Sequence, residues 1–177
     1  GQDVLACGRH DELRRMSLDR MMPMFAVDLA NFFLTVVPGG KLDFRDVVAR
    51  GVSRRDLVRF HEYYYRLDPF LKRFPPPVTV LTMDQVASPE SLRSGEYYND
   101  FLKPQGIHHQ MTIAVKACDK VMGVIALFRP ISKRNFSPSD RTKAEICASY
   151  LSGALEKIIY ADRALQRAVS YTHLRAH

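Results

Sequence analysis

Apolar and polar positions alternate along the first third of the chain with two different periods. Apolar residues recur at near-helical intervals over residues 11–22, which predicts a helix that ends at Pro23. Residues 31–37 are rich in aromatic and β-branched side chains, which predicts a strand. Proline and glycine at residues 38–41 supply a turn to a partner strand over residues 42–48. The first predicted sheet element is therefore a hairpin.

The middle of the chain predicts short elements separated by prolines. Ser53 is a suitable N-cap, because its hydroxyl can accept from the free amides of a first helical turn, and the apolar spacing continues the helix to about Tyr65. Residues 78–82 predict a short strand. Ser88, followed by proline, begins another helix, which ends before Pro104.

The last part of the chain predicts a second hairpin and one long helix. Residues 110–116 and 121–129 are apolar strands joined by a hairpin-length connection. Ser137 caps a helix over about residues 138–169. The resulting order is helix, two strands, helix, short strand, helix, two strands, helix. It predicts an antiparallel sheet flanked by helices, which is an α+β fold.

Composition and charge narrow the class of protein. With 177 residues, 46% hydrophobic and 25% charged, the chain is typical of a single globular domain. No apolar run approaches the roughly 18 residues of a membrane span. Three widely spaced cysteines fit the reduced thiols of a cytoplasmic protein, and their spacing indicates no metal site. The net charge of +7 favours a solvated basic face over a nucleic-acid surface.

Five motifs carry a resemblance to a known family. They are Tyr65–Pro69 (YRLDP), Val80–Asp84 (VLTMD), Glu96–Ile107 (EYYNDFLKPQGI), Val121–Arg129 (VMGVIALFR) and Phe136–Asp140 (FSPSD). Their order resembles the GAF-like N-terminal domains of bacterial LuxR-type transcription regulators, and the block at Glu96–Ile107 is the most specific part. The resemblance covers residues 11–169.

The resemblance implies a GAF-like antiparallel sheet of six or a similar number of strands, with a long C-terminal helix. It implies signal sensing and transcriptional control by a domain, residues 1–169, that is not itself an enzyme. A helix-turn-helix domain, which would bind DNA, would follow outside this chain. Residues 170–177 fit the helical pattern poorly, and we expect them to be a non-native tail. The ligand is not identified, and no cofactor is implied.

Candidate ligand-binding side chains come from the aromatic and polar residues of the motifs. The tyrosines could line an aromatic pocket, although packing with their hydroxyls at the solvent edge is the simpler explanation for any one of them. Asn99 and Asp100 could touch a ligand or could order the turn at residues 104–106. The candidates are Tyr64, Asp84, Tyr97, Asn99, Phe101, His109 and Met111.

Metal and catalytic chemistry find little support. His108 and His109 are adjacent at the start of a strand, so we expect their rings on opposite faces, where they would not share one ion. No nucleophile elbow or phosphate loop is present. An acidic group at residues 84–100, or His109 acting as a base, leaves a small cytoplasmic enzyme as an alternative.

The long helix carries a 3.5-residue apolar repeat, which is typical of a helix–helix seam. Its members are Cys147, Leu151, Ala154, Ile158, Ala161 and Leu165, continued by Ala168. A second stripe contains Ile146, Tyr150, Leu155 and Ile159. One stripe could cover the sheet and the other a second copy, so we expect a homodimer.

We interpret the chain as a cytoplasmic sensing and dimerisation module with an unknown small-molecule effector and no membrane partner. A purely structural dimerisation domain is the remaining alternative.

Overall fold

The computed structural model describes residues 3–35, 46–73, 78–117 and 120–175, and in them an antiparallel sheet of five strands in the order β2-β1-β5-β4-β3. The strands are β1 (Leu29–Leu34), β2 (Val47–Arg50), β3 (Val80–Thr82), β4 (His109–Ala117) and β5 (Lys120–Arg129). The two hairpins meet where β1 pairs with β5, so the first and last strands of the sequence pattern lie side by side. This arrangement confirms the predicted α+β class.

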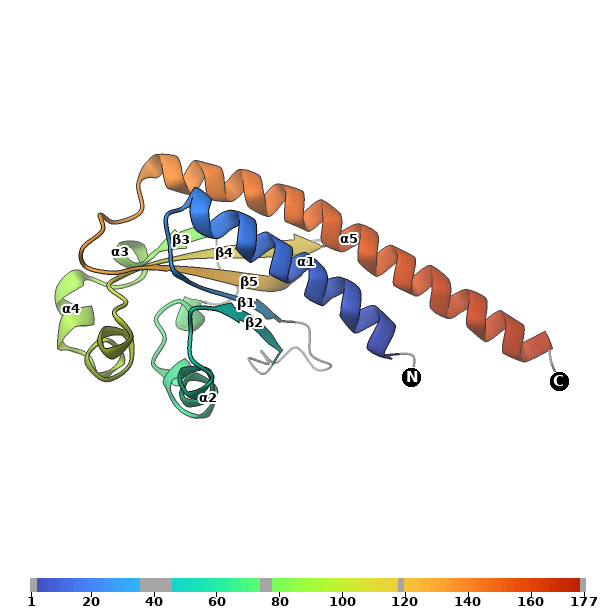
Figure 1. The fold of residues 1–177 in the computed structure, drawn as a ribbon, viewed down its shortest axis with the longest axis horizontal. Coiled ribbons are helices and arrows are strands. Elements are labelled where there is room, and N and C mark those ends of the chain that lie inside the picture. The colour runs from blue at the N-terminus through green and yellow to red at the C-terminus, as the bar shows by residue number, and fades with distance from the viewer. Residues whose placement is uncertain (1–2, 36–45, 74–77, 118–119, 176–177) are drawn as a thin grey trace.

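Helices cover both faces of the sheet (Figure 1). The long helices α1 (Asp3–Met24) and α5 (Pro138–Arg175) lie over one face and run in opposite directions. The other face carries α2 (Arg54–Glu62), the short helices α3 (Met83–Val86) and α4 (Pro89–Ser94), and a π-helix at Tyr97–Leu102. The short segments leave this second face less completely covered than the first.

Strand alternation divides the interior into two cores, because successive side chains point to opposite faces. On β5, Ile125 and Leu127 belong to the core under α1 and α5, which we call the helix-side core. Ala126 and Phe128 belong to the core under the short helices, the cleft-side core. The aromatic side chains of the π-helix complete that second core.

Element boundaries differ from the predictions where proline and glycine act locally. Ser53 caps α2 as predicted, since its hydroxyl accepts from the Asp56 amide at 3.1 Å. The helix expected from Ser88 breaks instead at Gly95, whose extended backbone (φ −87°, ψ 151°) separates α4 from the π-helix. β2 ends two residues after the predicted strand, and the predicted turn at residues 38–41 and the first four residues of that strand, 42–45, lie outside the described residues.

The two long helices exceed their predicted ends. Pro23 lies inside the last turn of α1, which continues to Met24. α5 continues to Arg175, past the predicted end at Val169. The described residues form five strands, in keeping with the six or similar number that the family resemblance implies.

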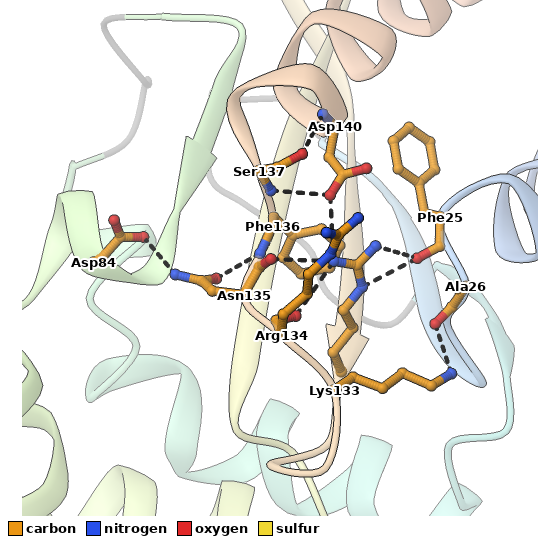
Figure 2. A network of polar contacts seen from close by, with 10 residues as sticks. Phe25, Ala26, Asp84, Lys133, Arg134, Asn135, Phe136, Ser137 and Asp140 are labelled. Carbon is orange, nitrogen blue, oxygen red and sulfur yellow. Dashed lines mark hydrogen bonds and ion pairs between the residues drawn. The ribbon is translucent and has the colours of Figure 1, made fainter.

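A buried arginine joins the two long helices at one end of the sheet. Arg129 is 6% exposed, and its guanidinium lies 4.1 Å from the ring centre of Phe136. Its nitrogens donate to the carbonyl oxygens of Phe25, Arg134 and Asn135 and to the carboxylate of Asp140. These four partners are labelled in Figure 2. We call this group the Arg129 junction. It fixes the end of α1 to the start of α5.

The acidic partner in the Arg129 junction is held in its charged form. Burial opposes the charge on Asp140, but the Ser137 amide at 2.9 Å and the charge of Arg129 outweigh it, so the pKa of Asp140 is lowered. The same carboxylate is the capping acid of α5, because it lies in the first turn, where helix dipoles favour negative charge.

Candidate functional site

The cleft-side face of the sheet holds two adjoining cavities beneath α2 and the π-helix. Each encloses about 40 Å³. They share Phe33, Phe60, Asp68, Gln110 and Ala126 as lining residues, so they form two compartments of one site. We call this site the sheet pocket. Each compartment exceeds the roughly 10–15 Å³ that one water molecule needs.

Aromatic rings form the outer wall of the sheet pocket. Phe60 of α2 lies 5.9 Å from Phe33 on β1 and 5.9 Å from Phe101 on the π-helix, measured between ring centres. Phe101 also stacks on Tyr97 at 5.7 Å. The wall therefore joins three separate elements through ring contacts that add about 0.5–1.5 kcal/mol each beyond their buried area.

The π-helix explains why so many of these rings point inward. Its wider turn is marked by the Lys103 amide, which donates to the carbonyl five residues earlier, at Tyr98. The extra residue in the turn lets four side chains of one short segment be buried, which an α-helix of this length would spread around its circumference. Those side chains are Tyr97, Tyr98, Phe101 and Leu102. A left-handed Gly106 (φ 74°) then ends the segment and directs the chain into β4.

A buried carboxylate lies at the boundary of the two compartments. Asp68 is 5% exposed and accepts from the Phe70 amide at 2.8 Å. Burial raises its pKa to about 6, against the lowering effect of that amide and of the Tyr97 hydroxyl. The pKa of Tyr97 is raised in turn, by burial and by the charge of Asp68. The described residues that line the compartments include no lysine, arginine or histidine.

Two further polar side chains line the sheet pocket with an acceptor left unused. The amide oxygens of Asn31 on β1 and Gln110 on β4 are buried and have no hydrogen-bond partner among the residues that the structure describes. Gln110 is oriented by its amide nitrogen, which donates to Thr112 at 3.2 Å. Between them the strand register places Ala126 opposite both Asn31 and Thr112, and its small side chain leaves the space open. An unsatisfied buried polar group costs about 1–3 kcal/mol, so these two oxygens lower the stability of the fold for as long as they are unpaired.

α2 covers the sheet pocket and is attached through one arginine. Arg59 pairs with Asp56 at 3.2 Å, and donates to the Tyr64 hydroxyl at 3.3 Å and to the Asp100 carbonyl at 3.0 Å. The described part of α2 has no buried residue. Its cover over the pocket therefore depends on Arg59 and on the ring contacts of Phe60.

The structure brings two of the predicted ligand-binding residues to the sheet pocket and separates others from it. Tyr97 and Phe101 line the first compartment. Tyr64 stacks on Phe101 at 4.5 Å but does not line either compartment. Asn99 is exposed, and its amide donates to the carbonyls of Arg93 and Gly95. Met111 is fully buried on the opposite face, in the helix-side core.

Asp84 and His109 line a different cleft of about 120 Å³, between β4, α3 and α4. His108 also lines it, with its Nδ1 2.7 Å from the Tyr98 hydroxyl. The prediction that the adjacent histidines face opposite sides is wrong: their ring centres are 4.6 Å apart. The reason is that β4 begins at His109, so strand alternation does not govern His108. Burial lowers the pKa of both histidines.

The acidic residues of this region do not gather. Asp84 accepts from Asn135 at 3.3 Å, and Glu96 accepts from the Tyr63 hydroxyl at 3.4 Å. Asp100 is exposed. No group of three or more His, Cys, Asp or Glu residues within the described part of the chain is placed to hold a metal ion.

The two apolar stripes of α5 do not divide as predicted. Cys147 and Leu151 of the first stripe pack against the helix-side core, and Leu155 of the second stripe is buried in it. Ile158 and Ala154 are half-buried. The exposed apolar residues come from both stripes; we call them the outer stripe. They are Ile146, Tyr150, Ala161, Leu165 and Ala168.

Sequence reasoning missed Asn31, Asp68 and Gln110, which supply the polar side of the sheet pocket. A usable signal was present. Asn31 interrupts one apolar strand, and Gln110 and Thr112 occupy alternating positions of another. Asn31 and Thr112 both pair with Ala126, so Asn31, Gln110 and Thr112 lie on the same face of the sheet. Polar residues with period two inside an apolar strand indicate a polar patch on a buried sheet face.

No protein-family model matches the sequence. No curated protein matches it either. Solved structures do resemble it in fold. A domain of a two-component sensor histidine kinase protein from Sinorhizobium meliloti 1021 is 18% identical with a TM-score of 0.63, over 86% of this chain and 95% of that one. The photoproduct state of GAF3 from Slr1393 of Synechocystis sp. PCC6803 is 12% identical with a TM-score of 0.61, over 86% and 96% of the two chains.

A third similar structure is the LBD domain of VqsR from Pseudomonas aeruginosa. It is 17% identical with a TM-score of 0.57, over 90% of this chain and 98% of that one. These likenesses show that the chain has a GAF-like fold. Within the described residues, no helix is both long enough and apolar enough to span a membrane.

Proposed function

We propose that this chain is the sensing module of a LuxR-type transcription regulator and that its effector binds in the sheet pocket. The observation that carries the proposal is the set of unpaired acceptors on Asn31 and Gln110 beside the buried Asp68. Buried polar groups are normally satisfied, so a ligand that pairs with them would recover free energy that the empty domain lacks. Most ligand sites are enclosed, largely apolar cavities with a few convergent polar groups, as this one is.

The route for a signal runs from the pocket to α5. β4 and β5, whose residues line the pocket on one face, carry Met111, Ile113 and Leu127 on the other face, in the core beneath α5. A ligand that separates or draws together the strands would alter this packing, provided that it binds two arrangements with different affinity. α5 would pass the change to a helix-turn-helix domain outside this chain. In this proposal the domain is cytoplasmic and performs no catalysis.

Native mass spectrometry of the domain purified from cells tests whether the pocket holds a molecule. We expect a small molecule that dissociates when the protein is denatured. Ala126→Phe should abolish its retention, because the ring would fill the space shared by both compartments. Ala164→Phe, at an exposed position of α5, is the matched control and should retain it. Equal retention by both variants would place the molecule elsewhere and overturn the proposal.

We also propose that the active form is a homodimer that meets through the outer stripe. Tyr150 is 78% exposed and Ile146 54% exposed, beside Met24 of α1, which is 51% exposed. Such a cluster of large apolar side chains favours a helix–helix contact. Tyr150→Glu should give a folded monomer in light scattering and circular dichroism, whereas Leu155→Glu, inside the helix-side core, should unfold the domain. A dimeric Tyr150→Glu variant would refute this interface.

A further inference from the structure

We propose that the sheet pocket selects a small organic ammonium ion, that is, a protonated amine with a short apolar group. This inference rests on the proposed sensing function and specifies the chemistry of its effector. Three features of the pocket point to it: the sign of its charges, the kind of hydrogen-bonding atom it exposes, and the material of its walls.

The charge inside the pocket is acidic and is not balanced by the lining. Its ionisable carboxylates are Asp56 and Asp68. Asp56 is paired with Arg59, which lies on the outer side of the wall, over the faces of Tyr64 and Phe101. Asp68 forms no ion pair within the described residues. The positive charge of Lys72 lowers the pKa of Asp68, but it is the smallest of the contributions to that pKa. An anionic ligand would meet this carboxylate without a compensating cation, whereas a cation would complete it.

The buried side-chain atoms of the pocket that lack a partner among the described residues are both acceptors. They are the amide oxygens of Asn31 and Gln110. The Asp68 carboxylate lines the same compartment and already accepts from the Phe70 and Leu71 amides and the Tyr97 hydroxyl, so it contributes chiefly its charge. A primary ammonium group brings three N–H donors and no acceptor, so it can pair with both amide oxygens while its charge faces the carboxylate. A carboxylate or phosphate would bring only acceptors and would leave the protein oxygens unpaired.

The walls suit a desolvated cation. Phe33, Phe60 and Phe101 surround the compartment together with Tyr97. The faces of aromatic rings attract ammonium groups, by about 0.5–2 kcal/mol depending on desolvation. The small volume of each compartment, about 40 Å³, limits the ligand to a short chain unless α2 moves outward.

Burial of Asp68 raises its pKa to about 6, and a bound cation would lower it again, so binding should strengthen between pH 5 and pH 7.

Titration calorimetry with four probes of similar size tests this selectivity. Butylamine, butyramide, butanol and butyrate share a short alkyl group and differ in the polar end. With the full 177-residue chain at pH 7.5 we expect butylamine to bind at least tenfold more tightly than any other probe. Asp68→Asn should weaken butylamine binding by at least tenfold. Asp28→Asn, whose carboxylate is exposed near Lys133, is the matched control and should bind like the wild type.

The outcomes separate this inference from the proposed function. If butyramide or butanol binds as tightly as butylamine, the pocket is a ligand site but not an ammonium site. If none of the four binds, the ammonium inference fails, whereas the sensing role of the pocket still stands or falls with the native mass spectrometry of the Ala126→Phe variant. If butylamine binds equally well to the Asp68→Asn variant, the cation lies elsewhere. Gln110→Met gives a second readout should Asp68→Asn not fold, and it too should weaken butylamine.

Discussion

The two faces of the sheet each bury a charged side chain, Arg129 on one face and Asp68 on the other. Arg129 meets three carbonyl oxygens and a carboxylate, all from its own chain. Asp68 meets only neutral donors, and the amide oxygens near it on Asn31 and Gln110 have no partner. A complete polar network stabilises the fold, whereas an incomplete one costs stability. The difference indicates that the Arg129 junction stabilises the fold, whereas the sheet pocket contains hydrogen-bonding capacity that the described residues do not use.

The largest effect is expected from breaking the complete network. Arg129→Met would remove the ion-pair partner of the Asp140 carboxylate, which would keep only the Ser137 amide, and would leave the Phe25 carbonyl without its guanidinium donor. The free energy of unfolding should therefore fall by about 3–5 kcal/mol. Urea denaturation measures this loss. Lys133→Met is the control: Lys133 donates to Ala26 from a side chain that is 37% exposed, and should cost less than about 1 kcal/mol. Similar losses in both variants would show that the Arg129 junction stabilises the fold no more than an exposed hydrogen bond does.

A substitution in the sheet pocket is expected to have the opposite effect and to raise the free energy of unfolding. A carboxylate whose pKa is raised on folding destabilises the folded state as pH rises through the interval between the two pKa values. For Asp68 these are 3.8 and about 6, so its cost above pH 6 is about 3 kcal/mol. Asp68→Asn should therefore raise the free energy of unfolding at pH 7.5 by up to about 3 kcal/mol, and by almost nothing at pH 4. Urea midpoints at the two pH values measure it, and a loss at pH 7.5 would contradict the comparison.

A pair of identical substitutions sharpens the contrast on a smaller scale. Gln110→Met removes an unpaired buried oxygen and should raise the free energy of unfolding by about 1 kcal/mol. Gln85→Met removes an oxygen that accepts from the Thr82 amide at 2.9 Å, and should lower it by about 1 kcal/mol. Thermal melts of the two variants should therefore shift in opposite directions. Shifts of the same sign would mean that the Gln110 oxygen is satisfied.

The smallest effect should come from the end of α5, which belongs to neither region. Tyr171 is 71% exposed, and residues 170–177 were expected to be a non-native tail. Chains of residues 1–169 and 1–177 should melt within about 2 °C of each other, because an exposed helix end makes few contacts. A markedly lower melting temperature for the shorter chain would show that the tail contributes to folding.

The sequence predicted the fold well because its signals are local. Ser53 and Ser137 begin helices through caps that need only three residues, and the strands of both hairpins follow from runs of apolar and β-branched side chains. The π-helix could not be predicted in this way. Its register depends on Gly95 at one end and on packing against the sheet at the other, and the same aromatic residues would also suit an α-helix.

The pocket was predicted only in part, for a related reason. Tyr97 and Phe101 stand out in the sequence as aromatic residues of a motif, and they do line the cavity. Asp68 stood out only as part of the Tyr65–Pro69 motif. Its burial results from the meeting of the segment after α2 with the π-helix, far apart in the sequence. Met111 was a ligand-binding candidate, but the pairing of β4 places it on the opposite face, in the helix-side core.

The length of α5 has a mechanical consequence. Ala144, Ala148 and Leu155 hold its first half against the sheet, and α1 still reaches it at Asp162, 3.7 Å from His10. Residues 163–175 continue for about 20 Å past Asp162, at 1.5 Å per residue. A stiff helix that is held along its first half can act as a lever arm. A tilt of about 5° at Asp162 would swing the far end of the helix by roughly 2 Å, so a change too small to disturb the core would become a displacement of bond-length scale at Arg175.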